Sequence, residues 1–153
     1  MYFLKLIRLF DIFISILFLI IFFPLIIIIS LILFFHVGIN IFFISNRVGK
    51  NGIIFKMIKF RSFDPKHIEL NDNDIQPFFF GKIIRRLSLD EIPQLFNILL
   101  GHMSLVGPRP IPKIVEKKIN SKQALLRQKV RPGLTGYCQI KYDGKKRDWE
   151  EKI

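Results

Sequence analysis

The sequence predicts a mainly α-helical protein with a short β-hairpin, in which a long N-terminal helix is inserted into a membrane. Residues 12–35 are almost entirely apolar, which predicts the membrane helix. Two β-rich runs surround a turn motif within residues 41–60, and helical periodicity follows them. We therefore divide the chain into a membrane-inserted segment over residues 1–38 and a basic domain over residues 39–153.

The composition is hydrophobic and basic at once. Half of the 153 residues are hydrophobic, and 24 Lys and Arg stand against 12 Asp and Glu, for a net charge of +12. Intrinsic disorder is excluded because it requires low hydrophobicity, and Cys138 alone cannot form an internal disulfide. Residues 1–36 carry only +1 of the charge, so the composition is typical of a membrane anchor followed by a cationic domain.

The apolar segment is interrupted only by Ser15, Pro24 and Ser30. It is too long for the hydrophobic region of a signal peptide, and it lacks the polar face of a helix on a small soluble core. At 1.5 Å per residue it is long enough to cross a hydrocarbon core of ~30 Å. We expect membrane insertion.

Two topologies remain open from the residues alone. Lys5 and Arg8 precede the segment and further cations follow it, so the positive-inside rule would keep both flanks in the cytoplasm. A helix that enters, bends at Pro24 and returns to the same leaflet satisfies this rule. A kinked helix that spans the membrane is also tolerated.

Residues 41–46 and 53–60 are the predicted hairpin strands, and residues 47–52 with their Asn-Gly pair are the predicted turn. Residues 64–77 are polar with a proline near each end, which favours an exposed loop. Residues 78–87 are expected to form a short basic helix.

Residues 88–100 predict a helix that Gly101 ends. Ser88 and Glu91 have the spacing of a capping box. Pro93 lies past the first turn, so the helix either starts later than Ser88 or has a distorted first turn. The apolar face is expected at Ile92, Leu95, Phe96 and Leu99.

The remaining segments are shorter. Residues 106–112 contain three prolines and predict irregular backbone. Residues 114–130 predict a Lys-rich amphipathic helix, and residues 131–136 (RPGLTG) predict a tight turn.

Asp90 and Glu91 form an adjacent acidic pair among cations. Cations such as Arg85 are expected to keep both carboxyl groups ionised. An ionised Asp is able to attack phosphorus, and Mg²⁺ prefers oxygen ligands. The alternative is purely structural, because acids in the first turn of a helix commonly cap it.

Several cations are candidates for binding phosphate. Arg109 lies between two prolines, which favours a fixed guanidinium suited to bidentate contact. Lys59 ends a predicted strand, and Arg131 precedes a Pro-Gly pair. The alternatives are solvated side chains or contacts with anionic lipid. No nucleic-acid motif accompanies the charge, so we expect membrane lipids and no nucleic acid as partners.

Three stretches together resemble the bacterial sugar transferases, which are small monotopic phosphoglycosyl transferases. They are residues 46–63 (NRVGKNGIIFKMIKFRSF), 81–110 (GKIIRRLSLDEIPQLFNILLGHMSLVGPRP) and 129–136 (KVRPGLTG). The run SLDEIPQLFN followed by MSLVGPRP is highly specific. The resemblance covers nearly the whole chain, in order.

The resemblance implies a reaction and a location. The family moves a phosphosugar from a UDP-sugar to polyprenyl (undecaprenyl) phosphate and releases UMP, with Mg²⁺ and a covalent aspartyl intermediate. The reaction begins polysaccharide or glycoconjugate assembly on the cytoplasmic face of the bacterial inner membrane. The resemblance also implies a re-entrant helix hinged at Pro24.

The resemblance also implies roles for residues. Asp90 would be the nucleophile and Glu91 would hold Mg²⁺, while Arg8 and Asp11 would lie at the lipid interface. Contacts to phosphate or nucleotide would come from Lys59, Arg85, Arg109 and Arg131.

Three departures from the family pattern stand out. Phe23 precedes the hinge proline where small members have Ser, and His102 replaces an acid. Family members also continue for a few dozen residues beyond the position of Ile153. A second hypothesis is therefore a truncated, inactive, membrane-anchored homologue that binds substrate without turnover.

Overall fold

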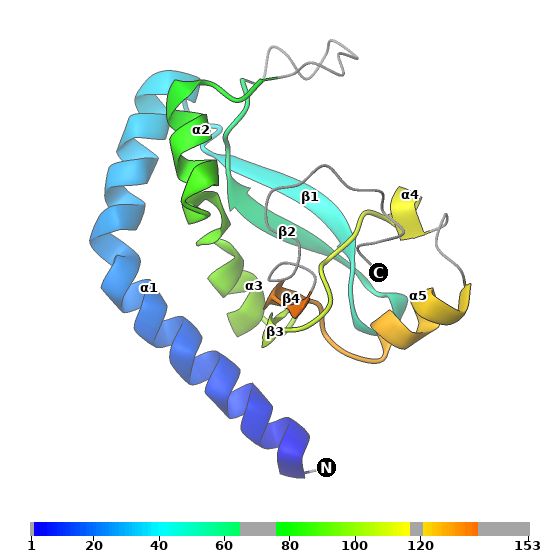
Figure 1. The fold of residues 1–153 in the computed structure, drawn as a ribbon. Coiled ribbons are helices and arrows are strands. Elements are labelled where there is room, and N and C mark those ends of the chain that lie inside the picture. Colours follow the sequence, from blue (N-terminus) through cyan, green and yellow to red (C-terminus); the bar gives the residue numbers. More distant parts are fainter. Residues whose placement is uncertain (1, 65–75, 117–120, 138–153) are drawn as a thin grey trace.

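The computed structural model describes residues 2–64, 76–116 and 121–137 (Figure 1). The long helix α1 (Tyr2–Val37) lies along one side of the molecule. Helices α2 (Phe79–Arg86) and α3 (Gln94–Leu99) lie next to it, and a β-hairpin lies beyond them. The predicted mainly helical fold with a hairpin is confirmed.

Helix α1 contacts the domain along one stripe and exposes the rest of its surface. Asp11, Ser15, Ile29 and Leu33 are buried at helical spacing, whereas most of its other large apolar side chains are exposed. Its length and composition are sufficient for a membrane span. Figure 1 shows a change of direction between its two halves, and Pro24, which has no N–H to donate, lies within the helix.

The hairpin pairs β1 (Phe42–Val48) with β2 (Ile54–Phe60) in antiparallel register. Strand β1 extends two residues further than predicted, so the turn is tighter. A 3₁₀ turn at Lys50–Gly52 closes it, with Asn51 at φ 56° and Gly52 at φ 75°. Asn and Gly tolerate this left-handed backbone better than other residues do.

Helix α2 forms where the short basic helix was predicted. Gly81 lets it pack directly on the preceding segment, because a Cβ at this position would lie 2.2 Å from the Ser62 carbonyl oxygen. Most of the predicted exposed loop, residues 65–75, lies outside the described residues.

The predicted helix over residues 88–100 is shorter than expected, and the capping box is wrong. Ser88 has φ 56° and makes no capping hydrogen bond with the described backbone. A 3₁₀ turn, η3 (Leu89–Glu91), comes first, and α3 begins only after Pro93. The reason is that Pro93 lacks the N–H that a continuous helix would require.

The later start also changes which side chains are buried. Ile92 and Leu95 are buried as predicted, but Ile98 replaces Phe96, which is 47% exposed. Gly101 ends the helix as predicted, with φ 84° and its N–H bonded to the Ile98 carbonyl.

Residues 131–136 were predicted to form a turn, and this prediction is wrong. They contain β4 (Gly133–Thr135), which pairs in parallel with β3 (Ser104–Val106). The Gly107 N–H bonds to the Thr135 carbonyl at 3.0 Å. A Cβ on Gly133 would lie 2.1 Å from the Gly107 nitrogen, so this close approach requires glycine.

The predicted helix over residues 114–130 contains two shorter helices in the described structure. They are α4 (Lys113–Glu116) and α5 (Ser121–Gln128), and residues 117–120 between them lie outside the described residues. The irregular backbone predicted for residues 106–112 is confirmed beyond the end of β3.

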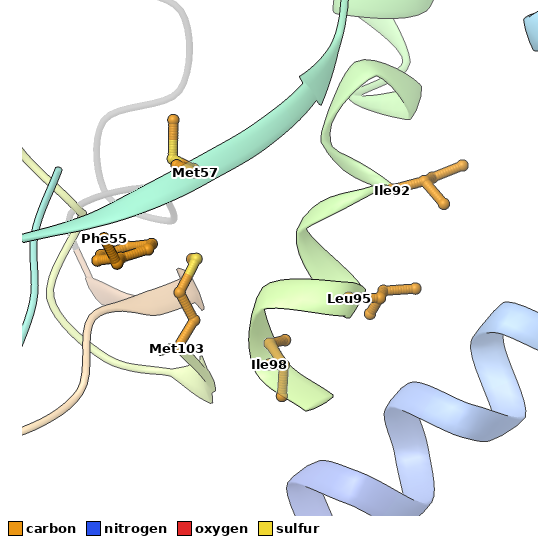
Figure 2. Close-up of a cluster of buried hydrophobic side chains, with 6 residues drawn as sticks. All are labelled: Phe55, Met57, Ile92, Leu95, Ile98 and Met103. Atoms are coloured by element: carbon orange, nitrogen blue, oxygen red, sulfur yellow. The ribbon is translucent and has the colours of Figure 1, made fainter. Parts of the chain in front are cut away.

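Two apolar clusters hold these elements together. Figure 2 shows the first cluster, to which β2, the segment from η3 to α3, and the segment after α3 contribute. The second joins α1 to β2 and α2. Both clusters bury residues of β2, and this fixes β2 beside η3. The first consists of Phe55, Met57, Ile92, Leu95, Ile98 and Met103, and the second of Ile29, Leu33, Phe60 and Ile84.

Candidate active site

The acidic pair lies in η3, between α2 and α3 and against β2. Asp90 is 6% exposed, and Glu91 is partly buried. The Lys59 ammonium, from β2, donates a hydrogen bond to the Glu91 carboxylate at 2.5 Å. Because Ile92 anchors this turn in the core, the two carboxyl groups are held on a rigid element rather than on a loop.

The pKa of Asp90 reflects both burial and the neighbouring charges. Burial raises the pKa of Asp90 above its ordinary value, and the neighbouring Glu91 adds to this effect. Lys59 and Arg85 act in the opposite direction but do not outweigh burial. Cations were expected to keep this carboxyl group ionised, and burial acts against them, a contribution that was not visible in the sequence.

A cavity of about 70 Å³ lies beside the acidic pair. Lys59 and Glu91 border it, but Asp90 does not line it. Arg109, a third predicted site residue, also lines the cavity. The other lining residues are Arg47, Met57, Gln94, Pro110, Gly133 and Leu134.

The loop that carries Arg109 is held at three points. The Gly133 N–H donates to the Pro108 carbonyl at 2.9 Å, and the Val48 N–H donates to the Ile111 carbonyl at 3.0 Å. The Arg127 guanidinium donates to the carbonyl of Arg109 itself. These bonds hold the backbone on which Arg109 lies, and a fixed guanidinium stays a prediction.

The other predicted phosphate-binding cations lie elsewhere. Arg85 is close enough to Asp90 to affect its pKa, and its guanidinium lies 4.9 Å from the centre of the Phe63 ring. Arg131 donates to the Gly101 carbonyl at 2.8 Å, so it contacts the chain next to the end of α3 and does not line the cavity.

Arg8 and Asp11 attach α1 to the domain. The Arg8 guanidinium donates to the carbonyls of Ile98 and Leu99, at 2.5 and 2.8 Å. The Asp11 carboxylate accepts bonds from the Ser104 hydroxyl at 2.8 Å and from the Leu105 N–H at 3.0 Å. Contact of Arg8 and Asp11 with lipid headgroups stays a prediction, as does a hinge at Pro24.

Sequence reasoning missed two residues of the cavity, Arg47 and Gln94. Gln94 is 2% exposed, and Arg47 is partly buried. Burial and nearby Arg109 lower the pKa of Arg47. A signal for Gln94 was available, because it lies one helical turn beyond Asp90 and Glu91. Arg47 carried no signal, because only the hairpin packing brings it to this place.

The donor set is compatible with Mg²⁺. The described residues contain no group of three His, Cys, Asp or Glu side chains that could enclose a metal. Mg²⁺ does not need such a group, because one or two carboxylates with phosphate and water oxygens commonly suffice. Glu91 and Asp90 are two adjacent carboxyl groups beside a cationic cavity, which fits a metal that arrives with a phosphate ligand.

Comparison with known proteins gives a match over nearly the whole chain. The family model described as Bacterial sugar transferase matches residues 2–153. The exopolysaccharide production protein ExoY of Sinorhizobium fredii is 37% identical over 157 residues. That alignment covers 87% of this chain and 67% of ExoY.

Two further relatives have names that state a reaction. The UDP-glucose:undecaprenyl-phosphate glucose-1-phosphate transferase of Klebsiella pneumoniae is 45% identical over 101 residues, which are 61% of this chain and 22% of that protein. The UDP-N-acetylgalactosamine-undecaprenyl-phosphate N-acetylgalactosaminephosphotransferase of Aeromonas hydrophila is 37% identical over 107 residues. These residues are 65% of this chain and 25% of that protein. The chain thus spans about a quarter of the length of these two relatives.

Proposed function

Because this chain belongs to the bacterial sugar transferase family, we propose that it transfers a phosphosugar from a UDP-sugar to undecaprenyl phosphate and releases UMP. Two relatives are named for transfer of a sugar phosphate to undecaprenyl phosphate. The observation that carries the proposal is the buried Asp90 beside the Lys59–Glu91 pair and a cationic cavity.

The proposed chemistry has two displacements at one phosphorus atom. The Asp90 carboxylate attacks the sugar-bearing phosphorus, so a phosphorus–oxygen bond to Asp90 forms and the bond to UMP breaks. A phosphate oxygen of undecaprenyl phosphate then attacks the same phosphorus and releases the Asp90 carboxylate. Two steps through one nucleophile allow a water-soluble and a lipid substrate to react in turn.

The surrounding residues have supporting roles in this proposal. Lys59 and Arg109 bind phosphate oxygens and offset their charge, and Arg85 does so beside Asp90. Glu91 would hold Mg²⁺, which offsets further negative charge of the diphosphate when bound. Asp90 itself is poorly solvated because it is buried, so its carboxylate is costly to form and reactive once formed.

For the membrane, we propose a re-entrant helix with the domain on the cytoplasmic face of the bacterial inner membrane. Both halves of α1 contact the same domain, at Asp11 with Ser104 and at Leu33 with Phe60. These positions are roughly 33 Å apart along a helix, which is about the thickness of the hydrocarbon core. A spanning helix would carry part of the domain across that core.

The reaction is tested by measuring UMP release from the chain in lipid nanodiscs, with undecaprenyl phosphate, Mg²⁺ and a panel of UDP-sugars. One sugar is expected to support turnover, and Asp90→Asn is expected to lose it by a factor of about 10³ or more. Intact mass spectrometry without undecaprenyl phosphate should show a phosphosugar adduct that the variant lacks. Asp90→Glu is the matched variant, because it keeps a carboxylate but displaces it. Normal turnover in Asp90→Asn would refute the assignment of Asp90 as the nucleophile.

The topology is tested with single cysteines at Lys5 and Lys50 in a Cys138→Ser chain. A membrane-impermeant thiol reagent should label both positions from the same side of sealed inverted vesicles. Labelling from opposite sides would show a spanning helix and would contradict the re-entrant proposal without affecting the proposed reaction.

A further inference from the structure

Two residues that line the cavity each carry a hydrogen-bond donor with no acceptor among the described residues. The donors are Nε2 of Gln94 and Nε of Arg47, and both atoms are buried. Gln94 is 2% exposed, so water outside the protein does not readily reach its amide. A buried donor without a partner costs free energy, and such donors in a cavity indicate that an oxygen-rich ligand completes them.

The charge of the cavity indicates which oxygen-rich ligand fits. Arg47, Lys59 and Arg109 line it, and Glu91 is the only acidic residue among the described residues that line it. Glu91 is already paired with Lys59 at 2.5 Å. The lining therefore carries a net positive charge that favours an anion.

The size of the cavity limits the ligand to a small group. A single water needs roughly 10–15 Å³ on a comparable measure, so about 70 Å³ holds a few heavy atoms. A phosphate group has this size, whereas a whole nucleoside does not. The rest of a nucleotide would extend out of the cavity.

The position of the cavity distinguishes the two phosphates of the proposed reaction. The lining comes from the hairpin, η3, α3, β4 and the loop around Arg109, and none of it comes from α1. A phosphate on a membrane-embedded lipid would approach along α1. A water-soluble nucleotide has no need to approach along α1, and a phosphate in the cavity would lie beside Glu91, the chain neighbour of Asp90.

We propose that Arg47 and Gln94 form a subsite that binds the uridine-side phosphate of the UDP-sugar and, after transfer, the phosphate of UMP. The inference rests on the proposed function and deepens it. As the bond from the sugar-bearing phosphorus to the bridging oxygen breaks, the electron pair stays on the UMP phosphate. Donors from Arg47 and Gln94 stabilise that growing charge, and no proton has to move.

The experiment measures equilibrium binding of UMP and of uridine to the full chain in nanodiscs by calorimetry. Gln94→Met keeps the size of the side chain and removes the donor. We expect UMP affinity to fall roughly 10- to 100-fold, because a hydrogen bond to a charged group is lost, while uridine affinity stays unchanged. Arg47→Met should behave alike. Arg86→Met, an exposed cation of α2 outside the cavity, is the matched control and should leave both affinities unchanged.

A second variant guards against a packing defect. Gln94→Glu has nearly the same shape but presents oxygens to the phosphate, so it should weaken UMP binding more than Gln94→Met does. Unchanged UMP affinity in the Gln94 variants would overturn the subsite, as would an equal loss for uridine and UMP. An altered KM for undecaprenyl phosphate with an unaltered KM for the UDP-sugar would assign the cavity to the lipid phosphate and also overturn the proposal.

Binding and turnover fail separately in this design. If UMP binding depends on Gln94 but the chain forms no UMP from any UDP-sugar, the subsite stands and the proposed reaction fails. If Asp90→Asn abolishes turnover while Gln94→Met leaves UMP binding intact, the reaction stands and the subsite fails.

Discussion

The two sides of the segment from η3 to α3 differ in how well their polar groups are satisfied. On the side of α1, the Asp11 carboxylate has two partners, Ser104 and Leu105, and Arg8 bonds two carbonyls at the end of α3. Ser15 is an exception there, because its buried hydroxyl has no partner among the described residues.

On the cavity side, Asp90 has a raised pKa, and the buried amide nitrogen of Gln94 has no acceptor among the described residues. The comparison shows that the charged groups that attach α1 are paired, whereas Gln94 and Arg47 each keep a buried donor without an acceptor among the described residues. Functional sites often combine local destabilisation with a rigid support in this way.

The largest effect on stability is expected from the core on the α1 side. Ile98→Ala should lower the free energy of unfolding by about 2–5 kcal/mol, because the Ile98 side chain of α3 is fully buried in the first apolar cluster. Chemical unfolding of the chain in nanodiscs measures this. Leu100→Ala, at a side chain that is 67% exposed, is the control and should change little. Equal effects of the two substitutions would contradict the packing described for α3.

A smaller loss is expected from the polar attachment of α1. Asp11→Ala should cost about 1–3 kcal/mol, because the Ser104 hydroxyl and the Leu105 N–H lose their shared acceptor. Asp11→Asn keeps an acceptor oxygen and should cost less. UMP affinity should persist in both variants, since Asp11 does not line the cavity. A large loss of UMP binding without unfolding would show that the two sides are not separate.

The pH dependence of the reaction is expected to change on the cavity side. Lys59 lowers the pKa of Asp90, so Lys59→Met should raise that pKa further. The nucleophile must be deprotonated, so the acid limb of kcat/KM should move to higher pH. Lys56→Met, at an exposed position of the same strand, is the matched control. If the acid limb of kcat/KM stays at the same pH in Lys59→Met, ionisation of Asp90 does not determine that limb.

The smallest effect is a gain in stability from Asp90→Asn. Burial raises the pKa of Asp90 in the folded state, so the folded state binds more protons than the unfolded state, and stability falls as pH rises through this range. Asn carries no such penalty. The variant should therefore melt slightly higher than the parent at pH 7, and the gain should shrink toward about pH 4, where the unfolded Asp protonates. A lower melting temperature at pH 7 would contradict the burial argument.

Features that depend on neighbouring residues were predictable from the sequence. The apolar run predicted α1, the Asn51-Gly52 pair predicted the hairpin turn, and Gly101 predicted the end of α3. In each case the conformation depends on side chains or glycines within a few positions. The capping box failed because Pro93, also a local feature, overrode it.

Features that depend on distant pairing were not predictable. The glycines at 107 and 133 allow β3 and β4 to pair, but either glycine alone predicts only a turn. Arg131 donates a hydrogen bond to the Gly101 carbonyl, a contact that the sequence did not indicate, and its contact with substrate stays a prediction. The roles of these residues depend on which backbone groups lie nearby after folding.

The sequence by itself determined the long apolar helix, the hairpin and the family, because each follows from residue order over short distances or from an uninterrupted motif. Only the tertiary structure decided that Arg47 and Gln94 share a cavity with Lys59 and Arg109, and that burial outweighs the cations around Asp90. The physical reason is that desolvation and convergence of charges are properties of the packed chain. They arise only when β1, β2, α3 and β4 come together.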